Sequence, residues 1–599
     1  MASSSPRHIV HLMSDDQGWG DVGYRRDRLC QSQFGRQQTM DTLADEDNET
    51  LWKCQDWQTP GFRDMAANGL RLERFYTSPI CSPTRAAMLT GRAAVRTGVV
   101  DQGVAMRLQE RTIALALRES GFSTAHFGKW HLDGLHIGVG GAPMCDNDFD
   151  PHAFGFDYYL SNSGQFEINP VLSRNGTVAN PLWGDGSDVL VSEALRFIGD
   201  AVAAQRRFFV AVWYSSPHAP WIPLSSDRNS FRCAKSTYYG EIQGVERSIG
   251  TMRQGLRRLG IENDTLVWFN SDNGGDDPKT SPRIPRDTSF GLTGHKKSLN
   301  EGGIRVPAII EWPGHIVPRI SWRPACAYDL FPTIAEVVGL PQAAMLQPQD
   351  GLSLVSEFGG HSGDRTKPIA IQYKGSYAII DNDWKLLRGS DGSFRYFDLR
   401  ADPKENYNIS DRRRWSDRRR GQTHNYTGTS GTYFSDVEWM DVPTRERRAR
   451  VLRSYWHTFF RSANASNHGL DYGAPTRTRM GPGWDGGYWY TLKCHRCCLQ
   501  TVIRRLQWPV DENVKLFLNR TNWPVIDAGA LMMSFGGRRH PTTCLAMPET
   551  PRECIVVGRR GRNSLIVRPG NMTRLPQTDG EDDSGGGRGA DESASSPDD

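Results

Sequence analysis

The sequence predicts an α/β protein with a large mixed, mostly parallel sheet between layers of helices, followed by a smaller α+β unit with an antiparallel sheet. Short apolar runs alternate with helical stretches, which is typical of strands buried on both faces. Charged and polar clusters follow the ends of several of these runs, as at the ligand-binding edge of a parallel sheet. After about residue 365 the pattern changes to short segments typical of hairpins.

The first half of the chain supplies five predicted elements. In chain order they are a buried strand at 8–14, a capped helix that ends at Gly69 and continues into a strand up to 78, a helix from Pro83 to Leu89, and strands at 123–134 and 207–216. The strand at 207–216 is expected to be fully buried.

The strongest helical pattern of the chain follows. One apolar stripe, ended by Gly260, consists of Ile242, Val245, Ile249, Met252, Leu256 and Leu259. Further strands are predicted at 265–271 and 306–313, hairpins at 376–410 and a closing helix at 444–463.

This pattern divides the chain into four parts. Residues 1–365 are the predicted catalytic domain, with a polar surface insertion at about 25–57 that Cys30 and Cys54 could staple. Residues 366–470 form a smaller subdomain. The last two parts are an unassigned cysteine-containing extension at 471–576 and a disordered acidic tail at 577–599.

Composition excludes several classes of protein. The 599 residues include 38% hydrophobic and 23% charged residues, and the net charge is +4. That charge is too small for this length to indicate binding to nucleic acid or a membrane surface. No apolar run approaches the roughly 18 to 20 residues that cross a bilayer, so no membrane span is expected.

Two features of the sequence disagree about the cellular compartment. The N-terminus shows no apolar signal-peptide region, which by itself indicates the cytosol. Against this, eight Asn-x-Ser/Thr sequons begin at Asn48, Asn175, Asn263, Asn408, Asn425, Asn464, Asn519 and Asn571. The eleven cysteines would leave ten to pair as disulfides if one serves chemistry. We favour the secretory pathway, secreted or lysosomal; the alternative is chance sequons and free thiols.

Two pairs of oxygen donors follow predicted strands. Asp15 and Asp16 come after the first strand, and Asp272 and Asn273 come after the strand at 265–271. Four hard oxygen donors suit Ca²⁺, with Mg²⁺ as the alternative, rather than zinc. Each pair alone could equally cap a helix or turn. Their common place at one edge of a sheet favours a metal site.

Four cationic or titratable side chains lie near the same edge. Lys129 and His131 are two apart on a predicted strand and therefore should face the same way. His218 follows a Ser-Ser-Pro turn, and Lys296 lies between glycines. Taken singly, each is better explained as a solvated or core residue. Together they suggest an anionic substrate whose oxygens they hold, with a histidine or lysine as general acid.

The segment CSPTRAAMLTGR (81–92) is the most specific pattern in the chain. Its seven constrained positions would arise by chance about once in a million such chains. The segment resembles the signature of the type I sulfatases. In that family a maturation enzyme reads Cys-x-Pro-x-Arg, here Cys81, Pro83 and Arg85, and oxidises the cysteine to formylglycine (3-oxoalanine). The resemblance therefore implies a formylglycine-generating enzyme as a partner during maturation.

The resemblance extends over about residues 8–410. SDDQGWGDVGY and FNSDNGG look like the two metal loops of the family, implying Asp15, Asp16, Asp272 and Asn273 as ligands together with modified Cys81. GKWHLDG implies Lys129 and His131, and SSPHAP implies His218. GHKKSLNEGG implies Lys296, with Lys297 as the second choice by spacing from Glu301. The order of these segments is similar to the arylsulfatase and N-acetylgalactosamine-sulfatase branch, which implies an alkaline-phosphatase-like fold.

The resemblance also implies a mechanism. A hydrated aldehyde at position 81, made more acidic by Ca²⁺, attacks sulfur, while the alcohol leaves with a proton from His218 or Lys296. His131 then deprotonates the second hydroxyl, which expels sulfate. Lys129 and Lys296 hold sulfate oxygens, and Arg85 orients the diol.

Two other functions remain open at this point. One is a phosphate or phosphonate ester hydrolase of the same superfamily, which would need more metal ligands than the sequence offers. The other is an inactive protein that binds sulfated glycans. The substrate is expected to be a sulfated polysaccharide or a small sulfate ester, and the oligomeric state is not predicted. CHRCC (494–498), with Cys544 and Cys554, could bind zinc, but disulfides are favoured.

Overall fold

The structure is a computed structural model. It describes residues 6–24, 60–134, 144, 148–229, 236–279, 284–285, 288–360, 363–409, 442–467 and 471, and three antiparallel strands, β18 (Thr543–Ala546), β19 (Cys554–Arg560) and β20 (Asn563–Val567). The predicted insertion at 25–57, the acidic tail, and most of the extension at 471–576, CHRCC included, lie outside the described residues.

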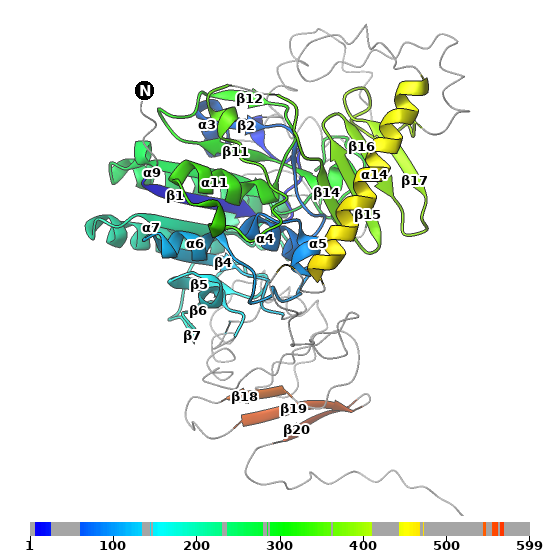
Figure 1. The fold of residues 1–599 in the computed structure, drawn as a ribbon. Helices are drawn as coiled ribbons and strands as arrows, with labels where there is room; N and C mark the ends of the chain where they lie inside the picture. Colours follow the sequence, from blue (N-terminus) through cyan, green and yellow to red (C-terminus); the bar gives the residue numbers. More distant parts are fainter. Residues whose placement is uncertain are drawn as a thin grey trace, which may run out of the picture.

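A ten-stranded mixed sheet forms the centre of the molecule (Figure 1). Its order is β12 (Arg319–Ser321), β2 (Leu70–Leu72), β11 (Ala308–Glu311), β9 (Thr265–Ser271), β1 (His8–Ser14), β8 (Phe208–Trp213), β4 (Ser123–Lys129), β5 (Tyr158–Asn162), β6 (Ser173–Arg174) and β7 (Thr177–Val178). The five strands from β9 to β5 are parallel, whereas β11 runs antiparallel to β9. The predicted mixed, mostly parallel sheet is confirmed.

Helices cover both faces of this sheet, and the strands explain why. β1, β8 and β9 are buried along their whole length, as their mostly apolar sequences predict. Val10 and Leu12 pack on one side with α3 (Pro60–Asn68), α7 (Gly186–Ala203) and α9 (Ser236–Arg258). Ile9 and Met13 pack on the other with α4 (Cys81–Thr90), α6 (Ile113–Glu119) and α11 (Leu330–Val338). Alternate residues of each strand therefore pack into two different hydrophobic cores, one on each face of the sheet.

Several predicted elements differ from the structure in their limits. The strand expected after Gly69 is two strands in different sheets: β2 joins the central sheet, while β3 (Phe75–Tyr76) pairs with β10 (Arg305–Val306) and β13 (Ala325–Cys326). The segment 306–313 is similarly divided between β10 and β11. Leu259, predicted to lie on the buried stripe of α9, follows the last turn of that helix and is exposed.

A second, four-stranded antiparallel sheet lies beside the central one. It consists of β14 (Ile369–Tyr373), β15 (Ser376–Asp381), β16 (Trp384–Arg388) and β17 (Phe394–Asp398). The long helix α14 (Val442–Asn467) runs along it (Figure 1). The predicted antiparallel hairpins and closing helix are confirmed. The boundaries drawn at residues 365 and 470 remain predictions.

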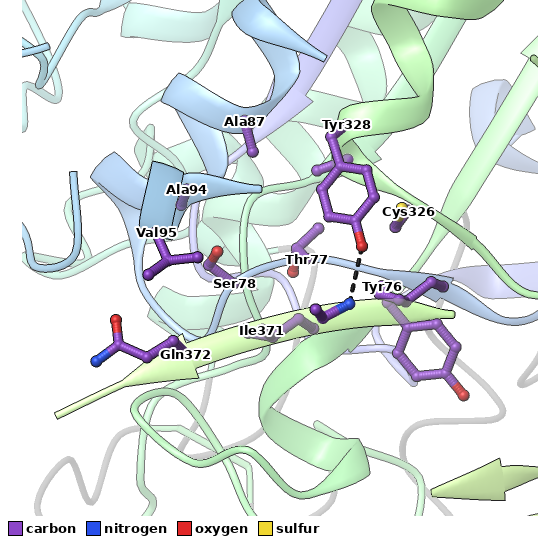
Figure 2. A pocket seen from close by; sticks show the side chains of 13 residues that line it. Tyr76, Thr77, Ser78, Ala87, Ala94, Val95, Cys326, Tyr328, Ile371 and Gln372 are labelled. Carbon is purple, nitrogen blue, oxygen red and sulfur yellow. Dashed lines mark hydrogen bonds between the residues drawn. The ribbon is translucent and has the colours of Figure 1, made fainter. Parts of the chain in front are cut away.

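A small cavity separates the helix α4 from the second sheet. Tyr76, Ala87, Cys326, Tyr328 and Ile371 line it together with neighbouring residues, and the Tyr328 hydroxyl accepts a hydrogen bond of 2.9 Å from the backbone N–H of Ala370 (Figure 2). Its volume of about 10 Å³ is the room of roughly one water molecule. The cavity is therefore too small to hold a ligand larger than water.

Cys326 corrects one expectation about the cysteines. Its thiol is buried and free, and it accepts a contact of 3.5 Å from an Arg365 nitrogen. The prediction that ten cysteines pair as disulfides is therefore wrong for Cys326. Of the helices in the described part of the chain, none is both long and apolar enough to cross a membrane.

Candidate active site

The two predicted oxygen-donor pairs meet at the carboxyl ends of β1 and β9. These strands are parallel neighbours in which Ser14 is opposite Ser271, so the residues that follow them leave the sheet together. The backbone N–H of Asp272 donates to the carbonyl of Ser14 (3.0 Å), and the backbone N–H of Asp16 donates to Asp272 Oδ1 (3.1 Å). Asp15, Asp16, Asp272 and Asn273 are all buried.

The helix α4 brings Cys81 to this cluster as its first residue. Every side chain of α4 is buried, and Pro83 lies in the first turn, where its missing N–H removes no helical hydrogen bond. The hydroxyl of Thr84 accepts from the Ser78 N–H (3.0 Å) and thereby holds the turn before the helix. Cys81 Sγ lies 3.4 Å from Asp15 Oδ1.

Arg85 follows Cys81 by one helical turn and therefore lies on the same face of α4. One guanidinium nitrogen donates to Asp272 Oδ2 (2.7 Å) and to Asp15 Oδ2 (3.3 Å), and the other donates to the carbonyl of Lys129 (2.7 Å). The guanidinium carbon lies 5.2 Å from the centre of the Trp213 ring. Arg85 thus connects the loops after β1 and β9 with the end of β4.

The two lysines contact the aspartates. Lys129 Nζ lies 2.5 Å from Asp15 Oδ2 and 3.6 Å from Cys81 Sγ. Lys296 Nζ donates to Asp16 Oδ2 (2.6 Å). Lys296 is buried whereas Lys297 is exposed, so the structure places the first of the two candidate lysines in the cluster.

The two predicted histidines differ in their contacts. His131 lies beyond β4, which ends at Lys129, so the argument from strand alternation is wrong for it. Its φ of 57° turns the chain, and its buried Nδ1 has no hydrogen-bond partner among the described residues. His218 Nε2 lies 3.4 Å from Asp16 Oδ2 and 3.2 Å from the Gln165 side-chain nitrogen.

Burial sets the protonation of the histidines and of Cys81. It lowers the pKa of His131 well below its ordinary value, with Lys129 and Arg85 acting in the same direction. It also lowers the pKa of His218, although Asp16 opposes this shift. Burial, and then the charges of Asp15 and Asp272, raise the pKa of Cys81 well above its ordinary value. An unmodified Cys81 is therefore a neutral thiol, which is a weak nucleophile.

The crowded carboxylates repel one another. Burial and the charge of Asp15 raise the pKa of Asp272 to about 7, despite Arg85. Burial would also raise the pKa of Asp15, but Lys129, His218 and Arg85 outweigh it and lower that pKa. Two neighbouring carboxylates whose pKa values move apart in this way are electrostatically coupled.

The chemistry of these donors fits a divalent cation. Ligand atoms of Asp15, Asp16, Cys81 and Asp272 all lie within 4.8 Å of one another. Within the described part of the chain, the buried Oδ1 atom of Asn273 has no hydrogen-bond partner, while its Nδ2 donates to Asp16 Oδ1 (2.6 Å). Three carboxylates balance the cations of Arg85, Lys129 and Lys296. A divalent ion would therefore give the site the net positive charge that an anionic substrate needs.

The structure brings together all ten residues selected from the sequence, and it adds two. Gln165 contacts His218, and the ring of Trp213 makes a cation–π contact with the guanidinium of Arg85. Nothing in SNSGQFE singles out Gln165. Trp213 is the last residue of β8, the strand that precedes the His218 loop, and this position could have marked it as a candidate in the sequence.

Comparison with known proteins agrees with this geometry. Residues 7–340 match the family model described as Sulfatase. Arylsulfatase A of Homo sapiens is 27% identical over 470 residues, covering 68% of this chain and 84% of that protein. N-acetylgalactosamine-6-sulfatase of Canis lupus familiaris is 29% identical over 430 residues, covering 64% and 74%. The crystal structure of Ps i-CgsB in complex with k-i-k-neocarrahexaose superposes with a TM-score of 0.56 and 25% identity, covering 69% of this chain and 90% of that one.

The chain belongs to the sulfatase family, in its arylsulfatase and N-acetylgalactosamine-sulfatase-like branch. It is accordingly a sulfuric ester hydrolase with the fold expected of that family.

Proposed function

We propose that this sulfatase acts through a formylglycine made from Cys81 and a Ca²⁺ ion held by Asp15, Asp16, Asp272, Asn273 and residue 81, with Mg²⁺ as the alternative ion. The observation that carries the proposal is the position of Cys81. A buried neutral thiol lies against carboxylates and Lys129, inside a Cys-x-Pro-x-Arg segment. A thiol in that environment has little nucleophilicity of its own, so a modified side chain is the better reactant.

The bound ion would increase the acidity of the hydrated aldehyde at position 81 and neutralise charge on the sulfate oxygens. The aldehyde hydrate supplies one hydroxyl to attack sulfur and a second that lets sulfate leave. Around it, Lys129 and Lys296 hold sulfate oxygens, because their ammonium groups lie at the carboxylate cluster. Arg85 fixes the orientation of residue 81 through both metal loops.

The two histidines are proposed to move the protons. His218 lies beside Asp16 at the edge of the cluster and would protonate the leaving alcohol, with Lys296 as the alternative acid. His131 has a free ring nitrogen and a lowered pKa, so it is neutral at pH 7 and would accept the proton of the second hydroxyl.

We propose sulfated carbohydrates or aryl sulfates as substrates. Relatives named arylsulfatase A and N-acetylgalactosamine-6-sulfatase, and a similar structure bound to a neocarrahexaose, support this class of substrate. A compartment in the secretory pathway, secreted or lysosomal, is supported by the sequons. Of the four in the described residues, Asn175, Asn263 and Asn464 are exposed and Asn408 is half-buried.

Mass spectrometry of the tryptic peptide FYTSPICSPTR (75–85) tests the modification. Protein made in its own host, or together with a maturation enzyme, is expected to yield a peptide in which sulfur and two hydrogens are replaced by one oxygen. The Cys81→Ala variant is the matched control. Unmodified cysteine in a well-folded native protein would contradict the proposal and favour a glycan-binding role.

Two activity assays address the alternatives. Aryl sulfate and aryl phosphate with the same leaving group are compared on the modified, Ca²⁺-loaded enzyme. We expect a preference for sulfate because the described residues contain one group of candidate metal ligands, without a second metal site beside it. Faster hydrolysis of the phosphate would favour the phosphatase, and hydrolysis of neither would favour an inactive binding protein.

A further inference from the structure

One buried carboxyl group outside the active site contacts both ends of the loop that carries His218. Glu241, in the second turn of α9, accepts a hydrogen bond of 2.6 Å from the Ser216 hydroxyl and one of 2.7 Å from the backbone N–H of Ile222. Ser216 precedes His218 by two residues, and Ile222 follows it by four. Glu241 therefore fixes residues 215–222, the His218 loop, near its start and at its end.

The helix α9 packs closely enough against this loop to make both bonds. A Cβ on Gly240 would lie only 2.8 Å from ring atoms of Pro223, the residue that follows the loop, so a glycine is needed beside Glu241. The ring of Trp221, inside the loop, meets the ring of Tyr238 on α9 edge to face, with 6.4 Å between the ring centres. The loop thus rests on the first two turns of α9.

The imidazole ring of His218 depends on this loop for its position. Its Nδ1 lies 2.5 Å from the carbonyl oxygen of Ala219, the next residue of the same loop. Its Nε2 reaches the active site, 3.4 Å from Asp16 Oδ2 and 3.2 Å from the Gln165 side-chain nitrogen. Because the bond to Ala219 moves with the loop, a displacement of the loop would carry Nε2 away from the site.

Glu241 supports the loop as a hydrogen-bonding group rather than as a charge. Burial, and then the charge of Asp185, raise the pKa of Glu241 to about 8, although its hydrogen bonds to the loop act in the opposite direction. Burial also raises the pKa of Glu167 well above its ordinary value, and the charge of Glu241 and a hydrogen bond to it act in the same direction. This buried pair therefore retains protons at pH 7, so glutamine is a close match for Glu241 in charge and in shape.

We propose that Glu241 is a positioning residue for the departure of the alcohol: it holds the His218 loop so that His218 Nε2 reaches the leaving oxygen. The inference rests on the proposed function and deepens it, because it assigns this proton transfer to His218 rather than to Lys296. Glu241 itself does not touch the substrate in this scheme.

The step that depends on this position transfers the sulfuryl group. The ionised hydroxyl of residue 81 forms a bond to sulfur, and the bond between sulfur and the alcohol oxygen breaks. The electron pair of that bond stays on the alcohol oxygen, which takes the proton from Nε2 of protonated His218. A general acid must lie within hydrogen-bond distance of the oxygen that it protonates, so the rate of this step is sensitive to the position of the loop.

The dependence of the rate on the leaving group separates this role from a merely structural one. Protonation of the leaving oxygen matters most for weakly acidic alcohols and little for a phenol acidic enough to leave as its anion. Phenyl sulfate and 4-nitrophenyl sulfate are similar in shape and differ mainly in this respect. Their kcat/KM values measure the stabilisation of the transition state relative to free enzyme and ester, so they report on this step rather than on the later release of sulfate.

Glu241→Met removes both hydrogen bonds and keeps the length of the side chain. On the modified, Ca²⁺-loaded enzyme we expect kcat/KM for phenyl sulfate to fall about 100-fold, the loss that a misplacement of about 1 Å produces. For 4-nitrophenyl sulfate it should fall no more than about threefold. Glu241→Gln keeps an oxygen for the Ile222 N–H and should bring both values back to within about threefold of the wild-type enzyme.

Glu246→Met is the matched control. Glu246 lies on the same helix, is buried, and likewise accepts two hydrogen bonds from outside the helix, but from the backbone N–H groups of Gly61 and Phe62. Its replacement should lower the stability of the protein and leave the ratio of the two kcat/KM values as it is in the wild-type enzyme.

Ser216→Ala covers the case in which Glu241→Met does not fold. This variant removes one of the two bonds to Glu241 and keeps the bond from Ile222. Loss of one hydrogen bond corresponds to about fivefold, so we expect kcat/KM for phenyl sulfate to fall about fivefold and the value for 4-nitrophenyl sulfate to stay near that of the wild-type enzyme.

Two outcomes would overturn the inference. A wild-type ratio of the two kcat/KM values in the folded Glu241 or Ser216 variants would show that the loop position does not govern protonation of the leaving group, and would favour Lys296 as the acid. Equal losses on both esters would show a structural role alone. The proposed function fails separately, if wild-type protein with formylglycine at position 81 hydrolyses neither ester.

Discussion

Individual residues at the active site hold unusual backbone conformations. Asp16 has a φ of 63° and His131 a φ of 57°, in the left-handed region that few residues other than glycine adopt. Each follows by two residues a strand that ends at the site, β1 for Asp16 and β4 for His131. Such strain persists where surrounding contacts determine it, here the carboxylate cluster and its cations.

Asn273 provides the residue-level test of the metal site. Asn273→Leu keeps the size of the side chain but removes the buried Oδ1, which has no hydrogen-bond partner among the described residues. A ligand that binds the folded state stabilises it by about 2.7 kcal/mol at 100 times its dissociation constant. We expect Ca²⁺ to raise the thermal unfolding temperature of the wild-type protein, and the variant to need about tenfold more Ca²⁺ for the same rise.

The readout is a Ca²⁺ titration monitored by thermal unfolding, so it does not depend on activity. Asn68→Leu, at the exposed end of α3, is the control and should titrate like the wild-type protein. Identical Ca²⁺ dependence in the Asn273 variant would show that this amide is not a ligand.

At the scale of elements, α9 supports the amino end of α3 with a buried carboxylate. Glu246 accepts hydrogen bonds from the backbone N–H groups of Gly61 and Phe62, the latter at 3.0 Å. These bonds satisfy donors that a helix start leaves free. Burial nevertheless dominates and raises the pKa of Glu246 to about 7.

This raised pKa predicts a pH dependence of stability. Between the ordinary pKa of about 4.5 and the folded value of about 7, the folded state binds more protons at Glu246 than the unfolded state, so stability falls as pH rises. The share from Glu246 is at most about 3 kcal/mol over this window. Denaturant unfolding of the wild-type protein and Glu246→Gln at pH 5 and pH 7.5 should show a smaller loss in the variant. Parallel pH profiles would contradict the assignment.

At the scale of the whole molecule, a buried ion network connects the second sheet to the active-site region. Lys385, on β16, lies 2.9 Å from Glu301 Oε1 and 2.8 Å from Glu405 Oε1, and all three side chains are buried. The Tyr76 hydroxyl donates to Glu301 Oε2 (3.0 Å). Glu301 begins the short helix α10 (Glu301–Ile304), five residues after Lys296.

The two glycines after Glu301, Gly302 and Gly303, allow the backbone of this segment to pack closely against the backbone of residues 294–298. A Cβ on Gly302 would lie 2.2 Å from the carbonyl oxygen of Gly294, and one on Gly303 would lie 2.1 Å from that of Ser298. The Glu-Gly-Gly segment is therefore fixed by packing, and it places the loop that carries Lys296 against the cluster.

Removing the central cation should destabilise the molecule. Lys385→Met removes the cation that the buried carboxylates of Glu301 and Glu405 share, and breaking a buried ion pair in this way costs about 3–5 kcal/mol. We expect a clear fall in the denaturation midpoint, measured with guanidinium and near-UV circular dichroism. Lys367→Met, at an exposed site, should change stability by no more than about 0.5 kcal/mol. A Lys385 variant as stable as this control would show that the network does not hold the two sheets together.

The sequence by itself determined the order of strands and helices, the donor pairs and the Cys81 segment. Mostly apolar runs such as 8–14 and 265–271 favour buried parallel strands, and the polar residues that follow them then meet at one edge of the sheet. The helical stripe of α9 and the hairpins of the second sheet are likewise local patterns.

Only the tertiary structure decided which residues contact one another. The division of 70–78 between two sheets, the turn at His131 and the contact of Gln165 with His218 depend on partners far away in the chain. The pairing of Lys385 with Glu301 likewise joins distant segments. Local periodicity carries no information on such contacts, because packing and burial between distant segments determine them.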